Sequence, residues 1–174
     1  MKPKIRELLN ESACAHSPAK KSACNAPTPG ATTGGCAFEG AQISLFPYAD
    51  AAHLVHGPLT CLGASWETRA TNTSWPGRDL TQMGFTTAIT NSDVVFGGEA
   101  KLAKAIDHIV TRYAPQAVFV YATCVTALIG DDLDAICSQA EATHGLPVVP
   151  VHAPGFVGSK NLGNKLGGEA LLDY

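Results

Sequence analysis

The chain lacks any concentration of basic residues. Asp, Glu, Lys and Arg make up only 16% of its 174 residues, and the formal net charge is -3. A nucleic-acid-binding domain usually carries a clustered basic face and a high isoelectric point, whereas the sequence pI here is about 6.0. We therefore expect no nucleic-acid partner.

A secretory signal and a membrane anchor are also missing. The N-terminus carries Lys2, Lys4 and Arg6, but no long apolar run follows these charges. The segment therefore matches neither a signal peptide nor a membrane span, and we expect a cytoplasmic protein. Six cysteines in that compartment are expected to be thiols or metal ligands and not disulfides.

Two common site signatures are absent. Gly97 and Gly98 precede a helical pattern, but the chain has neither Gly-x-Gly-x-x-Gly nor Gly-Lys-Ser/Thr, so a nucleotide site is weakly supported. Structural zinc sites favour close pairs such as Cys-x2-Cys. Here 24 residues separate Cys36 from Cys61, and 62 separate Cys61 from Cys124. This spacing disfavours a zinc-binding structural domain. Measuring metal content and visible colour would distinguish such a domain from an iron-sulfur protein.

The hydrophobic pattern predicts an α/β domain, because 45% of the chain is hydrophobic and strand-like runs alternate with amphipathic ones. Such an alternation predicts a parallel sheet flanked by helices. The expected strands are residues 94–96, 117–121 and 147–151, and the expected helices are residues 48–56, 99–113 and 131–143, with a further helix beginning near Leu166. We expect residues 1–35 to be a short helix and an extended arm, and residues 36–174 to be the α/β domain.

Three cysteines stand beside small residues where structured segments end. Cys36 follows two glycines, Cys61 follows an expected helix stopped by Gly57 and Pro58, and Cys124 lies just beyond an expected strand. Open turns of this kind let a thiolate approach metal, as iron-sulfur ligation requires, and sites in α/β sheets form outside the carboxyl ends of strands. Three thiolates leave a cubane cluster one ligand short, so another chain is expected to supply the fourth.

The remaining cysteines and His56 have other interpretations. Cys14 and Cys24 lie in the arm and could be extra ligands, although nothing in their sequence context fixes their approach to metal. Cys137 falls on the apolar stripe of an expected helix and is interpreted as a core residue. His56 is either a ligand, a hydrogen-bond donor near the site, or a capping and packing histidine, of which the last is the commoner case.

Several segments together carry a resemblance to a known family. They are residues 35–41, 56–61, 65–69, 108–113, 121–124, 130–133 and 158–164. These segments resemble the nitrogenase component-1 superfamily, and within it the scaffold subunits that assemble the iron-molybdenum cofactor. The resemblance covers nearly the whole chain.

The resemblance implies a Rossmann-type fold and a [4Fe-4S] cluster shared at a subunit interface, with Cys36, Cys61 and Cys124 as this subunit's ligands. It further implies a NifN-like partner in a heterotetramer. A precursor made by NifB would bind transiently to the full-length protein, and nitrogenase component 1 would accept the matured iron-molybdenum cofactor.

Residues 159–164 separate this chain from catalytic members of the superfamily. Catalytic alpha subunits carry Ser-Gln-Ser-x-Gly-His there, whereas this chain has Ser-Lys-Asn-Leu-Gly-Asn. Asparagine cannot act as an acid or base as histidine does, so the difference favours a scaffold over a catalyst. By position, Arg69, Lys160 and Asn164 are candidate cofactor-binding residues.

Two enzyme alternatives within the superfamily stay open: a catalytic nitrogenase alpha-like subunit, and an electron-transfer subunit of the protochlorophyllide-reductase type. Family members run to several hundred residues, while this chain ends at Tyr174. The resemblance therefore implies an N-terminal fragment whose α/β domain is truncated at its C-terminal end.

Overall fold

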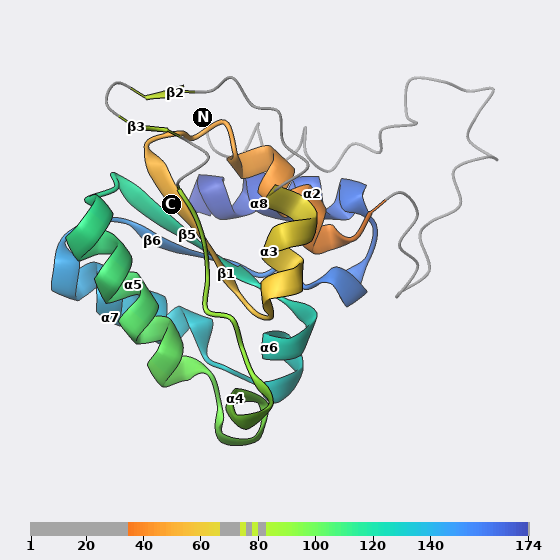
Figure 1. The fold of residues 1–174 in the computed structure, drawn as a ribbon. Helices are drawn as coiled ribbons and strands as arrows, with labels where there is room; N and C mark the ends of the chain where they lie inside the picture. Colours follow the sequence, from red (N-terminus) through yellow and green to blue (C-terminus); the bar gives the residue numbers. More distant parts are fainter. Residues whose placement is uncertain (1–34, 67–73, 76–77, 80–82, 174) are drawn as a thin grey trace, which may run out of the picture.

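Four parallel strands form the central sheet, in the order β4-β1-β5-β6 (Figure 1). The structure is a computed structural model that describes residues 35–66, 74–75, 78–79 and 83–173. The strands are β1 (Ala51–His56), β4 (Gly84–Thr86), β5 (Ala117–Ala122) and β6 (Val148–Val151). β1 pairs along its whole length with β5, from Ala51 opposite Ala117 to His56 opposite Ala122. The parallel α/β sheet predicted from the sequence is confirmed.

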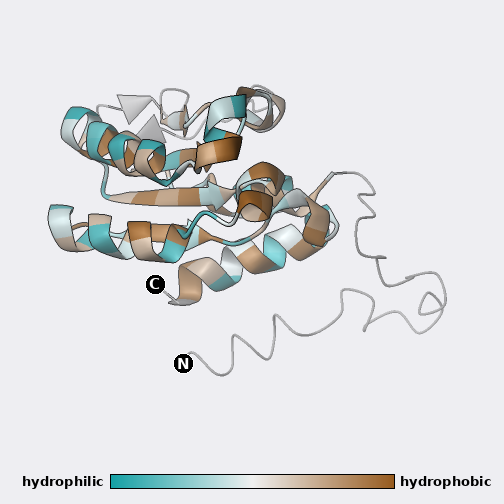
Figure 2. Cartoon of the chain, turned by 90° about the horizontal axis from the view of Figure 1, so that it is seen from below, coloured by the Kyte–Doolittle hydropathy of each residue, from teal (hydrophilic) through white to brown (hydrophobic). Residues whose placement is uncertain are grey.

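Helices cover both faces of this sheet. One face packs on α5 (Glu99–Tyr113) and α7 (Leu133–His144), and the other packs on α2 (Ala37–Leu45), α3 (Leu59–Trp66) and α8 (Lys160–Asp173). Figure 2 shows the apolar strands in the middle, with hydrophilic residues on the outward sides of the helices. The molecule therefore has two apolar cores, one on each side of the sheet.

The second half of the chain follows the predicted pattern closely. α5 spans the predicted residues 99–113, while β5, α7 and β6 match their predicted segments to within two residues at each end. Cys137 lies on the buried side of α7, so its interpretation as a core residue is confirmed. These helices each turn one apolar face to the sheet, and that periodicity is visible in the sequence.

The predicted helix over residues 48–56 is wrong, because this segment forms the central strand β1. All six β1 residues are buried, three on each face of the sheet. A strand buried on both faces shows no alternation of apolar and polar residues. Its apolar run therefore resembles a helical stripe in the sequence. Residues 59–61, which the sequence predicts to be a turn carrying Cys61, are instead the beginning of α3.

The predicted strand at residues 94–96 is also wrong. These residues end α4 (Asn91–Phe96), which begins with a capping box formed by Thr90 and Asp93. Val95 is 73% exposed and Phe96 86% exposed, so the apolar run lies on the surface. A short apolar run does not by itself distinguish a strand from a helix.

The remaining described elements are short. They are α6 (Cys124–Ile129), the 3-10 turn η3 (Gly155–Val157), and an antiparallel pair of β2 (Ser74–Trp75) with β3 (Arg78–Asp79). α8 begins at Lys160, earlier than the predicted start near Leu166. The predicted N-terminal helix and nearly all of the arm, with Cys14 and Cys24, lie outside the described residues. Within the described part, no helix is long and apolar enough to cross a membrane.

The helices α2 and α8 pack backbone to backbone. A Cβ at Gly163 of α8 would overlap the main chain of Ala37 at the start of α2, so only glycine permits this approach. The amide of Ala37 donates to the carbonyl of Gly158 at 3.0 Å, and Cys36 forms an isolated bridge with Ser159. The beginnings of α2 and α8 therefore lie side by side.

Candidate metal-cluster site

The structure brings Cys36, Cys61 and Cys124 together near the carboxyl end of the sheet. Cys36 immediately precedes α2, Cys61 lies in the first turn of α3 just after β1, and Cys124 is the first residue of α6 just after β5. All three are partly buried and present as thiols. Their positions agree with the rule that sites in open α/β sheets form beyond the carboxyl ends of strands.

Gly155 lies between two of these thiols. A Cβ added to Gly155 would stand 3.1 Å from Sγ of Cys124 and 3.2 Å from Sγ of Cys36. The sum of these two distances is an upper limit for the separation of the two sulfur atoms. Glycine at the start of η3 therefore lets the backbone approach both thiols closely, and any larger residue would displace them.

Burial and neighbouring thiols raise the pKa of Cys61. Loss of solvent is the larger cause, and the negative charge of a thiolate at Cys124 or Cys36 adds to it. Three thiolates so close together repel one another, and a bound cation relieves that repulsion and supports deprotonation. The donor set therefore fits a positively charged metal centre with affinity for sulfur.

The spacing of the three thiols fits a multi-iron cluster better than a single ion. Within the described ranges, no group of three or more His, Cys, Asp or Glu side chains is arranged to hold one metal ion. In a cubane cluster each thiolate binds a different iron atom, so its ligands stand farther apart than those of a tetrahedral zinc ion.

His56 is committed to a buried hydrogen-bond network and does not point to the thiols as a ligand. Its Nε2 lies 2.9 Å from Oδ2 of Asp131, and its Nδ1 lies 3.1 Å from Oγ1 of Thr87. Burial lowers the pKa of His56, while the hydrogen bond and the charge of Asp131 oppose that shift. A neutral ring donates from Nε2 to the carboxylate and accepts the Thr87 hydroxyl at Nδ1. Of the roles considered for His56, the packing role is the one the structure supports.

Sequence reasoning missed the residues that hold the ends of β1 and β5 together. The hydroxyls of Thr123 and Thr126 both donate to the backbone carbonyl of His56, at 3.0 and 2.9 Å. Thr123 and Thr126 also form a capping box at the start of α6. A Thr-x-x-Thr spacing resembles the usual capping-box pattern, and this signal would have placed a helix start at Cys124.

The candidate cofactor-binding residues lie beside the contact between α2 and α8. Nζ of Lys160 is 3.3 Å from Oε1 of Glu39, and the Ser44 hydroxyl donates to Oδ1 of Asn164 at 3.4 Å. Lys160 is next to Ser159, the bridge partner of Cys36, so it lies close to the thiol site. Arg69 lies outside the described residues.

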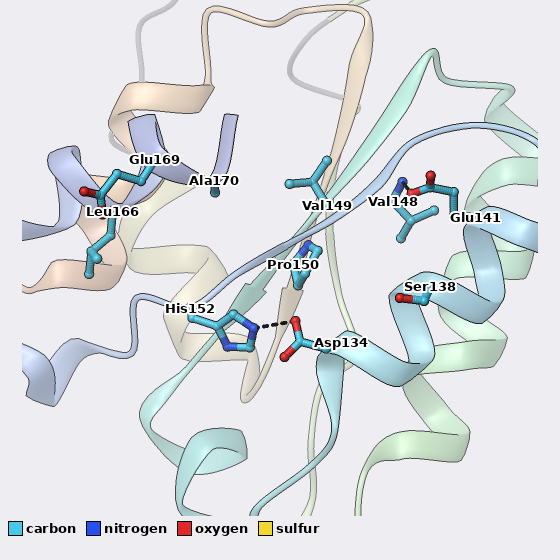
Figure 3. A pocket seen from close by; sticks show the side chains of 10 residues that line it. All are labelled: Asp134, Ser138, Glu141, Val148, Val149, Pro150, His152, Leu166, Glu169 and Ala170. Atoms are coloured by element: carbon cyan, nitrogen blue, oxygen red, sulfur yellow. Dashed lines mark hydrogen bonds and ion pairs between the residues drawn. The ribbon is translucent and has the colours of Figure 1, made fainter. Parts of the chain in front are cut away.

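A hollow of about 570 Å³ lies beside β6, between α7 and α8 (Figure 3). His152 pairs there with Asp134 at 2.8 Å. None of the cysteines or candidate cofactor-binding residues lines this hollow. The hollow is therefore separate from the thiol site, and its shape does not argue for a role in cluster binding.

Comparison with known proteins agrees with this arrangement. The family model described as nitrogenase component 1 type oxidoreductase matches residues 36–174. Nitrogenase iron-molybdenum cofactor biosynthesis proteins NifE are similar: the protein from Nostoc sp. is 60% identical over 98% of this chain, and that from Klebsiella pneumoniae is 53% identical over 97%. The chain spans 36% of the length of each.

A solved structure shares the fold. The structure titled "Nitrogenase Cp1 at pH 5" superposes with a TM-score of 0.78 at 32% sequence identity, and the match covers 85% of this chain and 31% of that one. The parallel sheet and its flanking helices therefore have a counterpart in a nitrogenase protein.

Proposed function

Because the chain belongs to the nitrogenase component 1 type oxidoreductase family, we propose that it is the cluster-binding part of a scaffold subunit for biosynthesis of the iron-molybdenum cofactor. High identity to NifE proteins across nearly the whole chain supports this function. Since the chain spans about a third of their length, the full assembly activity belongs to the full-length protein.

One observation carries the cluster assignment: the fold brings the thiols of Cys36, Cys61 and Cys124 together from three separate elements near the carboxyl end of the sheet. Cys36, Cys61 and Cys124 would each bind one iron of a [4Fe-4S] cluster, and a NifN-like partner would supply the fourth ligand across the interface. When bound, such a cluster supplies one-electron transfer. The apolar residues packed around Cys36 and Cys61 limit the access of water to the sulfur atoms, which influences cluster potential.

Residues 159–164 favour assembly over catalysis. Asn164 stands where catalytic alpha subunits of the superfamily have histidine, and its amide cannot donate or accept a proton as an acid or base. Lys160 and Asn164, with Arg69, are proposed to contact the cofactor precursor in the full-length protein. Identity to NifE proteins, at 53 to 60%, also exceeds the 32% identity to the nitrogenase structure, which favours the scaffold over an alpha-like catalyst.

The proposed partners follow from that role. The full-length protein would form a heterotetramer with a NifN-like subunit in the cytoplasm, receive an iron-sulfur precursor made by NifB, and pass the matured cofactor to nitrogenase component 1. The precursor is cargo, distinct from the interfacial cluster held by the three cysteines.

The test uses the full-length protein purified anaerobically with its NifN-like partner. Iron content and the electron paramagnetic resonance spectrum after reduction are compared for wild type, Cys124→Ala and Cys137→Ala. We expect Cys124→Ala to lose the [4Fe-4S] signal and Cys137→Ala to keep it, because Cys137 is buried in the core on the other face of the sheet. An unchanged spectrum and iron count in Cys124→Ala would remove this residue from the ligand set.

A further inference from the structure

The ends of β1 and β5 carry two of the three thiols, and one buried carbonyl connects them. We propose that Thr126, through its hydroxyl contact with the backbone carbonyl of His56, is a positioning residue that sets the spacing between Cys61 and Cys124. This inference rests on the proposed cluster site. It assigns a role to a residue that does not itself touch metal.

The hydroxyl contacts begin where strand pairing stops. The ladder between β1 and β5 ends with His56 opposite Ala122. Beyond that point the His56 carbonyl accepts from Thr126 Oγ1 at 2.9 Å and from Thr123 Oγ1 at 3.0 Å. Thr126 is fully buried and Thr123 nearly so, so water does not compete for these bonds. The threonine hydroxyls thus continue the connection between the two strands up to the thiols.

Thr126 is the central member of this contact. Its Oγ1 also accepts the backbone amide of Thr123 at 3.1 Å, which fixes the first turn of α6 and with it Cys124. Loss of this hydroxyl removes one donor from the His56 carbonyl and leaves the Thr123 amide without its acceptor. The first consequence falls on the end of β1, which leads to Cys61, and the second falls on Thr123, which immediately precedes Cys124.

The β1 side of the contact is held equally firmly. The His56 ring is fixed between Thr87 and Asp131, and the next residue, Gly57, donates its amide to Thr87 Oγ1 at 3.1 Å. Gly57 also packs directly against the Thr123 side chain. Because β1 and the His56 ring are held in place, we expect a shift of the His56 carbonyl to move residues 57–60 and, with them, Cys61.

The test compares Thr126→Val, which keeps the shape but removes the hydroxyl, with Thr126→Ser, which keeps the hydroxyl. Both are made in the full-length protein with its NifN-like partner. The measurements are the rate of iron release to an added chelator, the resonance spectrum of the reduced cluster, and the melting temperature. Residues that orient metal ligands typically affect metal affinity by about 10- to 100-fold. We expect Thr126→Val to release iron about tenfold faster with a shifted spectrum, and Thr126→Ser to behave as wild type.

A core variant separates positioning from general stability. Ile106→Val removes a methyl group from the opposite apolar core, and Thr126→Val is compared with it at matched distance below each melting temperature. Equal iron release in these two variants, or release from Thr126→Ser as fast as from Thr126→Val, would overturn the positioning role. Cys124→Ala is included in the same series. If wild type holds no iron that depends on Cys124, the proposed function itself fails, and the positioning role fails with it.

Discussion

Replacing Gly155 with alanine directly tests whether the thiols beside Gly155 must keep their positions for iron to bind. The backbone of Gly155 does not lie in the left-handed region, so alanine adds no backbone strain there. Its Cβ would approach Sγ of Cys124 to 3.1 Å and Sγ of Cys36 to 3.2 Å. Optimal contacts between non-bonded carbon atoms are about 3.5–4.0 Å, and sulfur is larger than carbon. Each thiol must therefore move by a few tenths of an ångström or more.

The expected result is a change at the site with a small change in fold stability. Forcing a methyl group into a packed core usually costs about 1–3 kcal/mol. Cys36 and Cys124 are only partly buried, so they can turn aside, and we expect a loss near the lower end of that range. Turned thiols no longer present their sulfur atoms in the original arrangement. We expect Gly155→Ala to retain less iron and to release it about tenfold faster.

The assay is anaerobic iron quantification and chelator-driven iron release in the full-length protein with its partner. Gly168→Ala is the matched control, because a Cβ at this α8 position meets no atom within 4 Å. That substitution should stabilise the helix by up to about 1 kcal/mol and leave iron release unchanged. A Gly155→Ala protein with the iron content, release rate and spectrum of wild type would refute the conclusion that the arrangement of the Cys36 and Cys124 thiols beside Gly155 matters for iron binding.

Three further predictions concern the surroundings of the site. Burial lowers the folded-state pKa of His56 below 6.5. The unfolded chain therefore binds the extra proton first, and the free energy of unfolding falls as the pH drops below about 6.5. Denaturant unfolding at several pH values should show a shallower decline of this free energy in His56→Gln than in wild type, and an identical decline would contradict this. Phe96→Ser should change the free energy of unfolding by less than about 0.5 kcal/mol, whereas Leu102→Ala in the buried core should lower it by about 2–5 kcal/mol. A comparable loss for both variants would contradict the exposed position of Phe96. Burial raises the pKa of Cys137 to about 12. Iodoacetamide at pH 8 should therefore leave this thiol unmodified until the protein unfolds, which peptide mass spectrometry would measure. Rapid modification of Cys137 in the native protein would argue against its burial.

Sequence reasoning identified the second half of the fold because α5 and α7 each have one apolar face and one polar face. It failed at β1 because that strand is buried on both sides and contains His56, a polar residue whose partners are elsewhere in the chain. The carboxylate that binds His56 belongs to Asp131, 75 residues later. No local pattern reports such a contact, since only the pairing of β1 with β5 brings the two segments together.

The candidate site was partly visible for a similar reason. Its cysteines stand out by residue type and by their small neighbours, so Cys36, Cys61 and Cys124 could be predicted from the sequence as candidate ligands, and the structure brings them together. Gly155 could not be predicted, because its role depends on its distance from thiols that come from other elements. The types of candidate ligand can thus be predicted from the sequence, whereas the distances between residues from different elements are set by the fold.

The backbone contact between α2 and α8 has a consequence for the order of events during synthesis. Ser44 on α2 finds its partner Asn164 on α8 120 residues later. At about 5–20 residues per second, the ribosome needs roughly 6–24 s to make the intervening chain. During that interval the segment carrying Cys36 has been translated but lacks the helix against which it packs. Metal delivery before residue 164 has emerged would therefore meet Cys36 without the helix that fixes its segment, so loading of the proposed site is expected to follow translation of α8.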